Sequence, residues 1–453
     1  MMFANPRSYL NKRQKTLLAG LLLALILFGA WVELRGAFLK RPMTDLGVYL
    51  RAGYAVRADI DIYSVTDDNG WHYVYPPFFA ILMSPLAHPP KDYDSSGYLP
   101  YKFTVGFWYV FTMALGIYGI HILAKTLEET TGDVNLKNPT VFSQQWWALR
   151  LIPFLIMLPA IGRSQMRGQV GLIVAYLLCI SASNILRKKR FMAGVWLSVA
   201  SAIKVIPVFL FILPVWRRDR LMLLGGVVGF LITLVIIPLL ILGIDDTITS
   251  YKTFYNEVLI AGFQGDQHST RGAELTCITC TDSNSPMAVL HNILNPEKTT
   301  RPREALPIVR LLHWLFSFML LALLLFYGDM KNNPSIYKNV QDKTHEIIFM
   351  GCLAMLMCIV SPVFHPHYIS MIVPFIVVLI FILWEMYGYN NIPTYWTVIL
   401  WSIPITHIVT SIGGPLWFLR DFGLVFFNTL ILFLSFVILL RQQTTLKVAQ
   451  MSK

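Results

Sequence analysis

Long apolar segments alternate with short polar ones along the whole chain. The apolar runs lie at about 17–34, 76–88, 103–124, 146–161, 169–186, 191–203, 205–216, 221–243, 306–327, 346–363, 368–386, 396–411 and 421–440. Many of them approach the roughly 20 apolar residues that a helix needs to cross the hydrocarbon core of a bilayer. The pattern predicts an all-α integral membrane protein with a single polytopic domain over residues 1–453.

The run at 76–88 differs from the others because it is short and proline bounds both its ends. We interpret it as a half-helix that enters the membrane from the outer side without crossing it. This leaves about 12 crossings, an even number, as two chain ends on one side of the membrane require. In an alternative topology this run crosses the membrane and the run at 146–161 does not. The topology of residues 76–161 therefore stays open.

A second irregularity is the break "KVIP" (204–207) between two short apolar runs. Broken helices at membrane depth are tolerated where they line a cavity or are buried in protein. Lys204 lies in this break, and a charged residue at such depth is costly. Lys204 is therefore a candidate functional residue.

Charge supports the membrane interpretation and orients the chain. Only 14% of the residues are charged, 55% are hydrophobic, and the net charge is +12. The basic residues cluster between apolar runs, at 11–15, 187–190, 217–220, 328–343 and 441–447. Cytoplasmic loops of membrane proteins carry such an excess, so we expect both termini in the cytoplasm and no nucleic-acid partner. The first run is too long for a cleaved signal and is expected to be a retained helix.

This orientation places two long polar segments, 39–75 and 244–304, on the outer side. From Thr44 the first segment has helical periodicity and is expected to lie on the membrane surface as an amphipathic helix. Its apolar stripe comprises Leu46, Tyr49, Leu50, Gly53 and Tyr54. With Thr44 as N-cap, Asp45 falls in the first turn. Asp45 either complements the helix dipole or acts as a general base at the boundary between water and lipid.

Cationic residues also occur on the expected outer side. Arg163 and Arg167 stand with Gln165 and Gln169 in "GRSQMRGQVG" (162–171). Two arginines there run against the usual charge bias and favour an anion, which is either a lipid headgroup or a substrate phosphate.

Two histidines, His365 and His367, flank a proline in "SPVFHPHYISMIVP" (361–374). No third metal ligand is evident nearby, so we predict no metal site. The pair serves phosphate contact, acceptor hydrogen bonding or structural capping. We expect Asp45, Lys204, the two arginines and the two histidines to face one outer-leaflet cavity. A single carboxylate among cationic donors suits a transfer in which a hydroxyl is deprotonated and a phosphate leaves.

The spacing of two of the five cysteines bears on a possible disulfide. Cys277 and Cys280 form "TCITC" in the second outer segment, while Cys179, Cys352 and Cys358 fall in apolar runs and are expected to pack there. Two thiols make an incomplete zinc site, so a small disulfide loop is favoured if the segment faces an oxidising compartment.

Several of these segments resemble glycosyltransferase family 87, whose members are GT-C integral membrane enzymes that use polyprenyl-phosphate sugars. The matching pieces are "TDLGVYLRAG…DIDIYSV" (44–65), "YVYPPFFAILMSPLA" (73–87), "GQVGLIVAYLL" (168–178), "AGVWLSVASAIKVIPVFLFI" (193–212), "SPVFHPHYISMIVP" (361–374) and, more weakly, "TDSNSPMAVLHNIL" (281–294). The resemblance implies that Asp45 is the catalytic base and that Lys204, His365 and His367 serve the donor phosphate. Further substrate contacts are expected from Tyr75, Arg163, Arg167, Gln169, Arg271 and Asn284.

The resemblance also implies a GT-C bundle of about 12 helices in a bacterial plasma membrane, with its active site on the outer face. The expected reaction transfers a hexose, with mannose favoured, from a polyprenyl-phosphate sugar to a hydroxyl of a lipid or glycan. It proceeds by a single displacement with inversion, without cofactor or metal. The acceptor stays open because "GDQHSTRGAELTCITC" (265–280) departs from the family pattern. Two alternatives remain, a secondary transporter of a small polar or anionic solute and an arabinofuranosyl- or aminoarabinose-type transferase.

Overall fold

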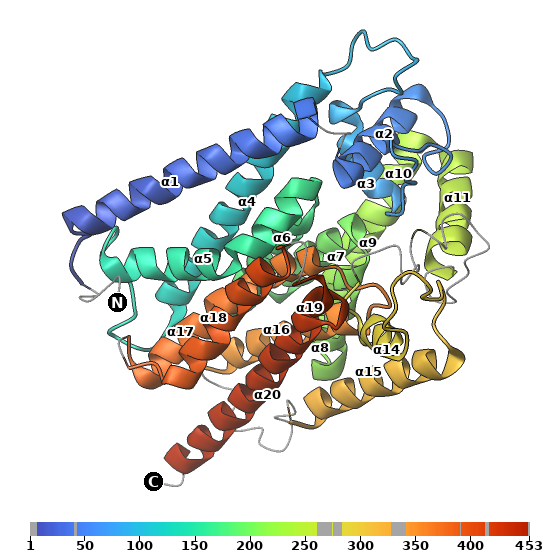
Figure 1. Cartoon of the computed structure of the whole chain (residues 1–453). Helices are drawn as coiled ribbons and strands as arrows, with labels where there is room; N and C mark the ends of the chain where they lie inside the picture. The colour runs from blue at the N-terminus through green and yellow to red at the C-terminus, as the bar shows by residue number, and fades with distance from the viewer. Residues whose placement is uncertain are drawn as a thin grey trace.

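The chain folds into a bundle of helices. The structure is a computed structural model that describes residues 7–39, 43–260, 274, 283–327, 341–389, 391–412 and 416–451. Within these ranges the regular structure is helical, and pairing of extended chain is limited to two isolated bridges, Tyr9 with Ser143 and Thr66 with His72. The predicted all-α class is therefore confirmed (Figure 1).

Seven helical stretches in the described ranges are long and apolar enough to cross a membrane. They are α1 (Lys12–Glu33) continued by η1 (Leu34–Leu39), α4 (Tyr101–Thr130), α5 (Gln144–Arg167), α9 (Arg220–Phe230) continued by η4 (Leu231–Ile236) and α10 (Ile237–Leu242), α15 (Pro307–Tyr327), η7 (Pro366–Ile372) continued by α17 (Val373–Tyr387), and α20 (Leu424–Met451). Each coincides with a predicted apolar run, because hydrophobic length is a local property of the sequence.

The remaining apolar runs form shorter helices. They are α3 (Pro77–Met83) with η2 (Ser84–Leu86), α6 (Gly171–Leu186), α7 (Arg190–Ile203), η3 (Ile206–Phe211) with α8 (Ile212–Arg217), α16 (Gln341–Val360) and α18 (Thr394–Val409). The run at 76–88 is the short one, as the half-helix interpretation requires, whereas α5 covers 24 residues. The helix lengths therefore favour the topology in which 146–161 crosses the membrane and 76–88 does not.

Burial separates the centre of the bundle from its rim. Every residue of α17 from Val373 to Trp384 is buried, whereas α1 packs on α4 and is otherwise almost fully exposed. A helix that is apolar all round and covered by protein belongs at the core, and one that is apolar and uncovered suits contact with lipid. The first residues of α1 and the last residues of α20 lie away from α2 (Thr44–Ala58) and α3 (Figure 1).

Helix α2 corrects two details of the sequence interpretation. Its N-cap is Met43, which makes no side-chain cap, so Thr44 is the first helical residue; Asp45 does lie in the first turn. The expected apolar stripe is buried, but so are Val48, Arg51, Ala52 and Ala55. The helix is therefore enclosed by protein around most of its circumference instead of lying on the membrane surface. It packs mainly against α3 and η2.

Two glycines permit the close packing that holds α2 in place. A Cβ added at Gly53 would lie 2.6 Å from the carbonyl oxygen of Met83, so the backbones of α2 and α3 are nearly in contact. Gly168 ends α5 in the left-handed region with φ of 70°, and a Cβ there would lie 2.5 Å from Cβ of Leu46. The C-terminus of α5 is thereby pressed against the first turns of α2.

Four further short helices complete the described part of the chain. They are α11 (Ile244–Thr253), η5 (Phe254–Ile260), α14 (Pro286–Leu294) and α19 (Trp417–Asp421). Helix α11 and η5 follow α10, and α14 precedes α15. The two segments predicted to be outer loops thus carry helices of their own.

Candidate active site

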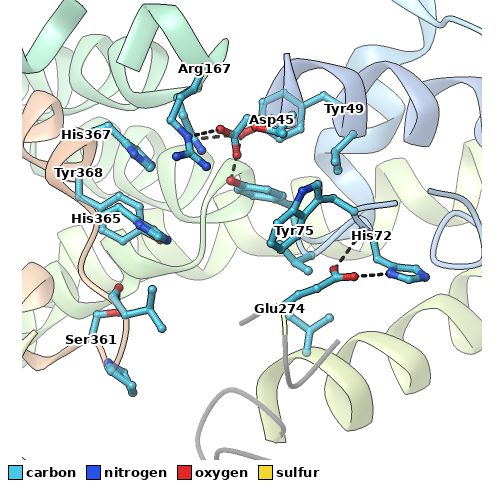
Figure 2. A pocket seen from close by; sticks show the side chains of 18 of the residues that line it. Asp45, Tyr49, His72, Tyr75, Arg167, Glu274, Ser361, His365, His367 and Tyr368 are labelled. Atoms are coloured by element: carbon cyan, nitrogen blue, oxygen red, sulfur yellow. Dashed lines mark hydrogen bonds and ion pairs between the residues drawn. The ribbon is translucent and has the colours of Figure 1, made fainter. Parts of the chain in front are cut away.

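A cavity of about 300 Å³ opens beside the first turn of α2. It is walled by that turn, by residues 71–75, by the end of α5, by η5 and by residues 361–368 (Figure 2). Its polar lining comprises Thr44, Asp45, Tyr49, His72, Tyr75, Arg167, Gln169, Glu274, Ser361, His365, His367 and Tyr368. A concave site that is apolar over much of its surface and carries a few convergent polar groups is the usual form of a small-molecule site.

Asp45 and Arg167 form an ion pair in this cavity. Nε of Arg167 donates to Oδ2 of Asp45 at 2.7 Å, and the side chains are 19% and 44% exposed for Asp45 and Arg167, respectively. Asp45 stands at the N-terminus of α2 and Arg167 at the C-terminus of α5, so each charge also complements the dipole of its own helix. Two helix ends therefore hold a carboxylate and a guanidinium together at the cavity surface.

A buried hydrogen-bond network lies directly behind this pair. The hydroxyls of Tyr49 and Tyr75 are 3.0 Å apart, and Tyr49 donates to Oε1 of Gln169 at 3.2 Å. The same oxygen accepts a hydrogen bond from Nζ of Lys204 at 3.3 Å. Loss of water raises the pKa of Tyr75, and the charge of Asp45 adds to the effect, so Tyr75 keeps its proton and can donate it in a hydrogen bond.

Lys204 lies behind the cavity wall and not on its surface. The helix α7 ends at Ile203, and Lys204 adopts extended backbone as its C-cap, as the predicted break requires. Its side chain is buried, with Nζ 4.2 Å from the ring centroid of Tyr368 and 5.9 Å from that of Tyr75. Tyr75 and Tyr368 both line the cavity, whereas Lys204 does not. Lys204 thus lies next to the residues of the cavity wall without being part of the lining.

His365 and His367 both line the cavity, with stacked rings whose centroids are 5.2 Å apart. Removal from water lowers the pKa of His365 to about 3, and the nearby charges of Arg167 and Lys204 act in the same direction. His365 is therefore neutral at physiological pH, which corrects the expectation of a cationic donor at this position. Nε2 of His367 is buried and has no hydrogen-bond partner among the described residues. Tyr368 packs edge-on against both rings.

Two of the expected substrate contacts lie outside the cavity lining. Arg163 donates to Oγ of Ser411, to the carbonyl oxygen of His407 and to Oγ1 of Thr410, at 2.8, 3.0 and 2.8 Å. These bonds tie α5 to the C-terminal end of α18. Asn284 is buried, and its backbone N–H donates to the carbonyl oxygen of Phe364 at 2.6 Å. Asn284 therefore supports the segment that carries the histidines.

Two further expectations lie outside the described residues. These are the substrate contact of Arg271 and the pairing of Cys277 with Cys280. The cysteines expected to pack in apolar runs, Cys179, Cys352 and Cys358, are buried and free. Among the described residues, no group of three or more His, Cys, Asp or Glu is arranged to hold a metal ion.

The structure also places a second carboxylate in the cavity, so the expectation of a single one is wrong. Glu274 accepts two hydrogen bonds from His72, from the backbone N–H to Oε2 at 3.1 Å and from Nδ1 to Oε1 at 2.8 Å. The two residues come from the first and the second outer segment. The sequence contains only a weak indication of this contact. It shows a histidine inside the aromatic stretch "WHYVYPP" (71–77) and an acidic residue in a polar loop.

Comparisons with known proteins place this chain in a family. The family model described as glycosyltransferase family 87 matches residues 73–362, more than half of the chain. No curated protein matches the chain. Among solved structures, ArnT from Cupriavidus metallidurans bound to undecaprenyl phosphate is similar with a TM-score of 0.40 and 15% identity, over 94% of this chain and 78% of that chain. From the extent of the family match, the chain belongs to glycosyltransferase family 87 and is a multi-pass membrane glycosyltransferase.

Proposed function

We propose that this glycosyltransferase moves a hexose, with mannose favoured, from a polyprenyl-phosphate sugar to a hydroxyl of a lipid or glycan. The observation that carries the proposal is the pairing of Asp45 with Arg167 in a cavity that His365 and His367 also line. A carboxylate that can take a proton and a guanidinium that can hold a phosphate are the two groups such a transfer needs.

The donor phosphate fits the wall made by Arg167, His365 and His367. A guanidinium binds phosphate oxygens through a pair of N–H donors, and each neutral imidazole can add one N–H donor. His367 belongs to this wall, and no described residue uses its Nε2. Lys204 lies beside Tyr368 and outside the cavity lining, and it contributes the field of its charge.

Asp45 supplies the base. In the proposed reaction the acceptor hydroxyl gives its proton to Asp45 while its oxygen forms a bond to the anomeric carbon. The bond from that carbon to the phosphate oxygen breaks, and its electron pair leaves with the polyprenyl phosphate. Arg167 lies beside the carboxylate and is therefore placed to stabilise the negative charge that develops on the leaving oxygen. One displacement of this kind inverts the anomeric configuration.

The proposed location of the reaction is the outer face of a bacterial plasma membrane. The basic clusters between apolar runs favour a cytoplasmic position for both chain ends. The first residues of α1 and the last residues of α20 lie away from α2, whose first turn borders the cavity (Figure 1). A donor embedded in the bilayer would then reach the cavity from the lipid and the acceptor from the outer leaflet or the aqueous space.

The experiment is a transfer assay with the purified full-length protein in lipid nanodiscs. Polyprenyl-phosphate mannose, polyprenyl-phosphate glucose and a polyprenyl-phosphate pentose are each offered with a set of glycolipid acceptors, and the products are identified by mass spectrometry and NMR. We expect a product that carries mannose with an anomeric configuration opposite to that of the donor. A retained configuration would contradict the mechanism, and transfer of the pentose alone would contradict the choice of sugar.

A further inference from the structure

The pair formed by His72 and Glu274 lies in the same cavity as Asp45, yet the proposed reaction does not use it. Figure 2 shows His365, His367 and Tyr368 on one side of the cavity and His72 with Glu274 on the other, with Asp45 and Tyr75 between them in this view. The cavity therefore has two polar ends, one built around a guanidinium and imidazoles and one around a carboxylate.

The carboxylate of Glu274 can accept hydrogen bonds in addition to those from His72. An ionised carboxylate only accepts hydrogen bonds, so Nδ1 of His72 carries the proton that joins the two side chains. Each carboxylate oxygen accepts one bond from His72 and keeps lone-pair capacity for another. The side chains of His72 and Glu274 are 20% and 16% exposed, so this capacity is open to an occupant of the cavity.

The segment that carries His72 is itself well fixed. Residue His72 pairs with Thr66 in an isolated antiparallel bridge. Between them, the carboxylate of Asp67 accepts hydrogen bonds from the backbone N–H groups of Asn69 and Trp71, each at 2.9 Å. Trp71 lines the cavity next to His72. A turn closed in this way presents an aromatic ring and a charged hydrogen-bond pair in a defined geometry.

The chemistry of this end identifies the class of its occupant. At neutral pH a phosphate diester has no proton to donate to a carboxylate and is repelled by it, whereas the hydroxyls of a sugar are hydrogen-bond donors. A displacement with inversion also requires the nucleophile to approach from the side opposite the leaving group. The end that faces away from Arg167, His365 and His367 is therefore the acceptor end.

We propose that Glu274, positioned by His72, is the acceptor subsite and binds hydroxyls of a neutral, sugar-bearing acceptor. This assignment rests on the proposed function. Glu274 sets the orientation in which one acceptor hydroxyl reaches Asp45, and Trp71 offers an aromatic surface beside it.

The first test separates acceptor binding from donor binding. Glu274→Gln keeps the shape of the side chain and removes its charge, and a hydrogen bond to a charged group typically accounts for a tenfold to hundredfold change in affinity. We expect a rise of about that size in the KM for a glycolipid acceptor, with the KM for the donor within about twofold of the wild-type value. His72→Phe, which releases Glu274, should shift the acceptor KM in the same direction. An unchanged acceptor KM, or a rise in the donor KM alone, would overturn the assignment.

A matched control is Glu297→Gln, because Glu297 is an exposed carboxylate of the second outer segment that does not line the cavity. It should leave both KM values as they are in the wild type.

A second test does not depend on turnover. Saturation-transfer NMR with methyl glycosides of mannose, glucose and galactose should give a signal with the wild-type protein that Glu274→Gln weakens and Glu297→Gln preserves. Equal signals for the wild type and Glu274→Gln would overturn the subsite even if transfer is observed. A wild-type protein that binds glycosides through Glu274 but transfers no sugar would instead contradict the proposed function and leave the subsite supported.

Discussion

The carboxylate of Asp45 accepts a hydrogen bond from Nε of Arg167 at 2.7 Å, and this contact joins the first turn of α2 to the last turn of α5. The two residues are 122 positions apart in the chain. The pair serves both halves of the proposed reaction, since one partner is placed to take a proton and the other to bind a phosphate. Four predictions follow from this arrangement and its surroundings.

Replacement of Asp45 by asparagine should abolish the base and keep the shape of the site. We expect the rate of sugar transfer to fall by roughly 10²- to 10⁴-fold, the range usual for loss of a general base. The matched control is Asp59→Asn at the other end of α2, where Asp59 is exposed and has a left-handed backbone that asparagine also adopts readily. Turnover is measured with a saturating donor. Transfer by the Asp45 variant at the wild-type rate would exclude the base assignment.

Arg167 and Arg163 should respond differently to the same substitution. Arg167→Gln removes a cation from the cavity, so the KM for the polyprenyl-phosphate donor should rise about tenfold or more, as expected for a lost charge-assisted bond. Arg163→Gln breaks the ties between α5 and α18, so its main effect should be a lower melting temperature in nanodiscs. A large rise in donor KM for the Arg163 variant and none for the Arg167 variant would reverse the roles given to them.

His365 should make the protein sensitive to acid. Its pKa is about 3 in the folded state, below the 6.5 of an ordinary histidine, so the unfolded chain binds a proton that the folded chain does not. Stability is therefore lost as the pH falls from about 6.5 toward 3. At pH 5 this amounts to at most about 2 kcal/mol for one such group.

His365→Gln removes this contribution, so its melting temperature should fall less than that of the wild type between pH 7 and pH 5. The measurement is a pair of thermal melts at each pH. Identical slopes for the two proteins would show that His365 is protonated or exposed in the folded state.

Gly168→Ala tests whether close packing of α5 on α2 is needed at the site. A Cβ at this position combines an unfavourable left-handed backbone with a 2.5 Å approach to Cβ of Leu46, which lies next to Asp45. We expect a loss of stability of roughly 2–5 kcal/mol, and a loss of transfer activity as Asp45 and Arg167 are moved apart.

Gly243→Ala provides the comparison for this variant, because Gly243 has φ of 80° and no atom within 4 Å of the added Cβ. With ψ of 174° its backbone lies in a region that is essentially restricted to glycine, so the variant carries backbone strain without the collision and should lose roughly 1–3 kcal/mol. Equal losses in the two variants would mean that the contact with Leu46 is unimportant. Thermal melts and transfer rates are measured on both.

Much of the architecture could be predicted from the chain alone. Hydrophobic length, the charge between runs and the prolines around 76–88 are local properties, and they sufficed to predict the all-α class, the short α3 and the break at Lys204. The position of Asp45 in the first turn of a helix also followed from local periodicity. The resemblance to family 87 added the expectation that these segments share one site.

The composition of the site was decided by tertiary packing. Nothing local distinguishes Arg167, which reaches Asp45, from Arg163, which binds the end of α18. Three features depend on which helices meet: the enclosure of α2, the position of Lys204 beside the ring of Tyr368, and the approach of Glu274 to His72 across 202 positions. Sequence patterns report the faces and ends of single helices, whereas contacts between distant side chains depend on how those helices pack, and one glycine such as Gly168 can determine how closely two of them approach.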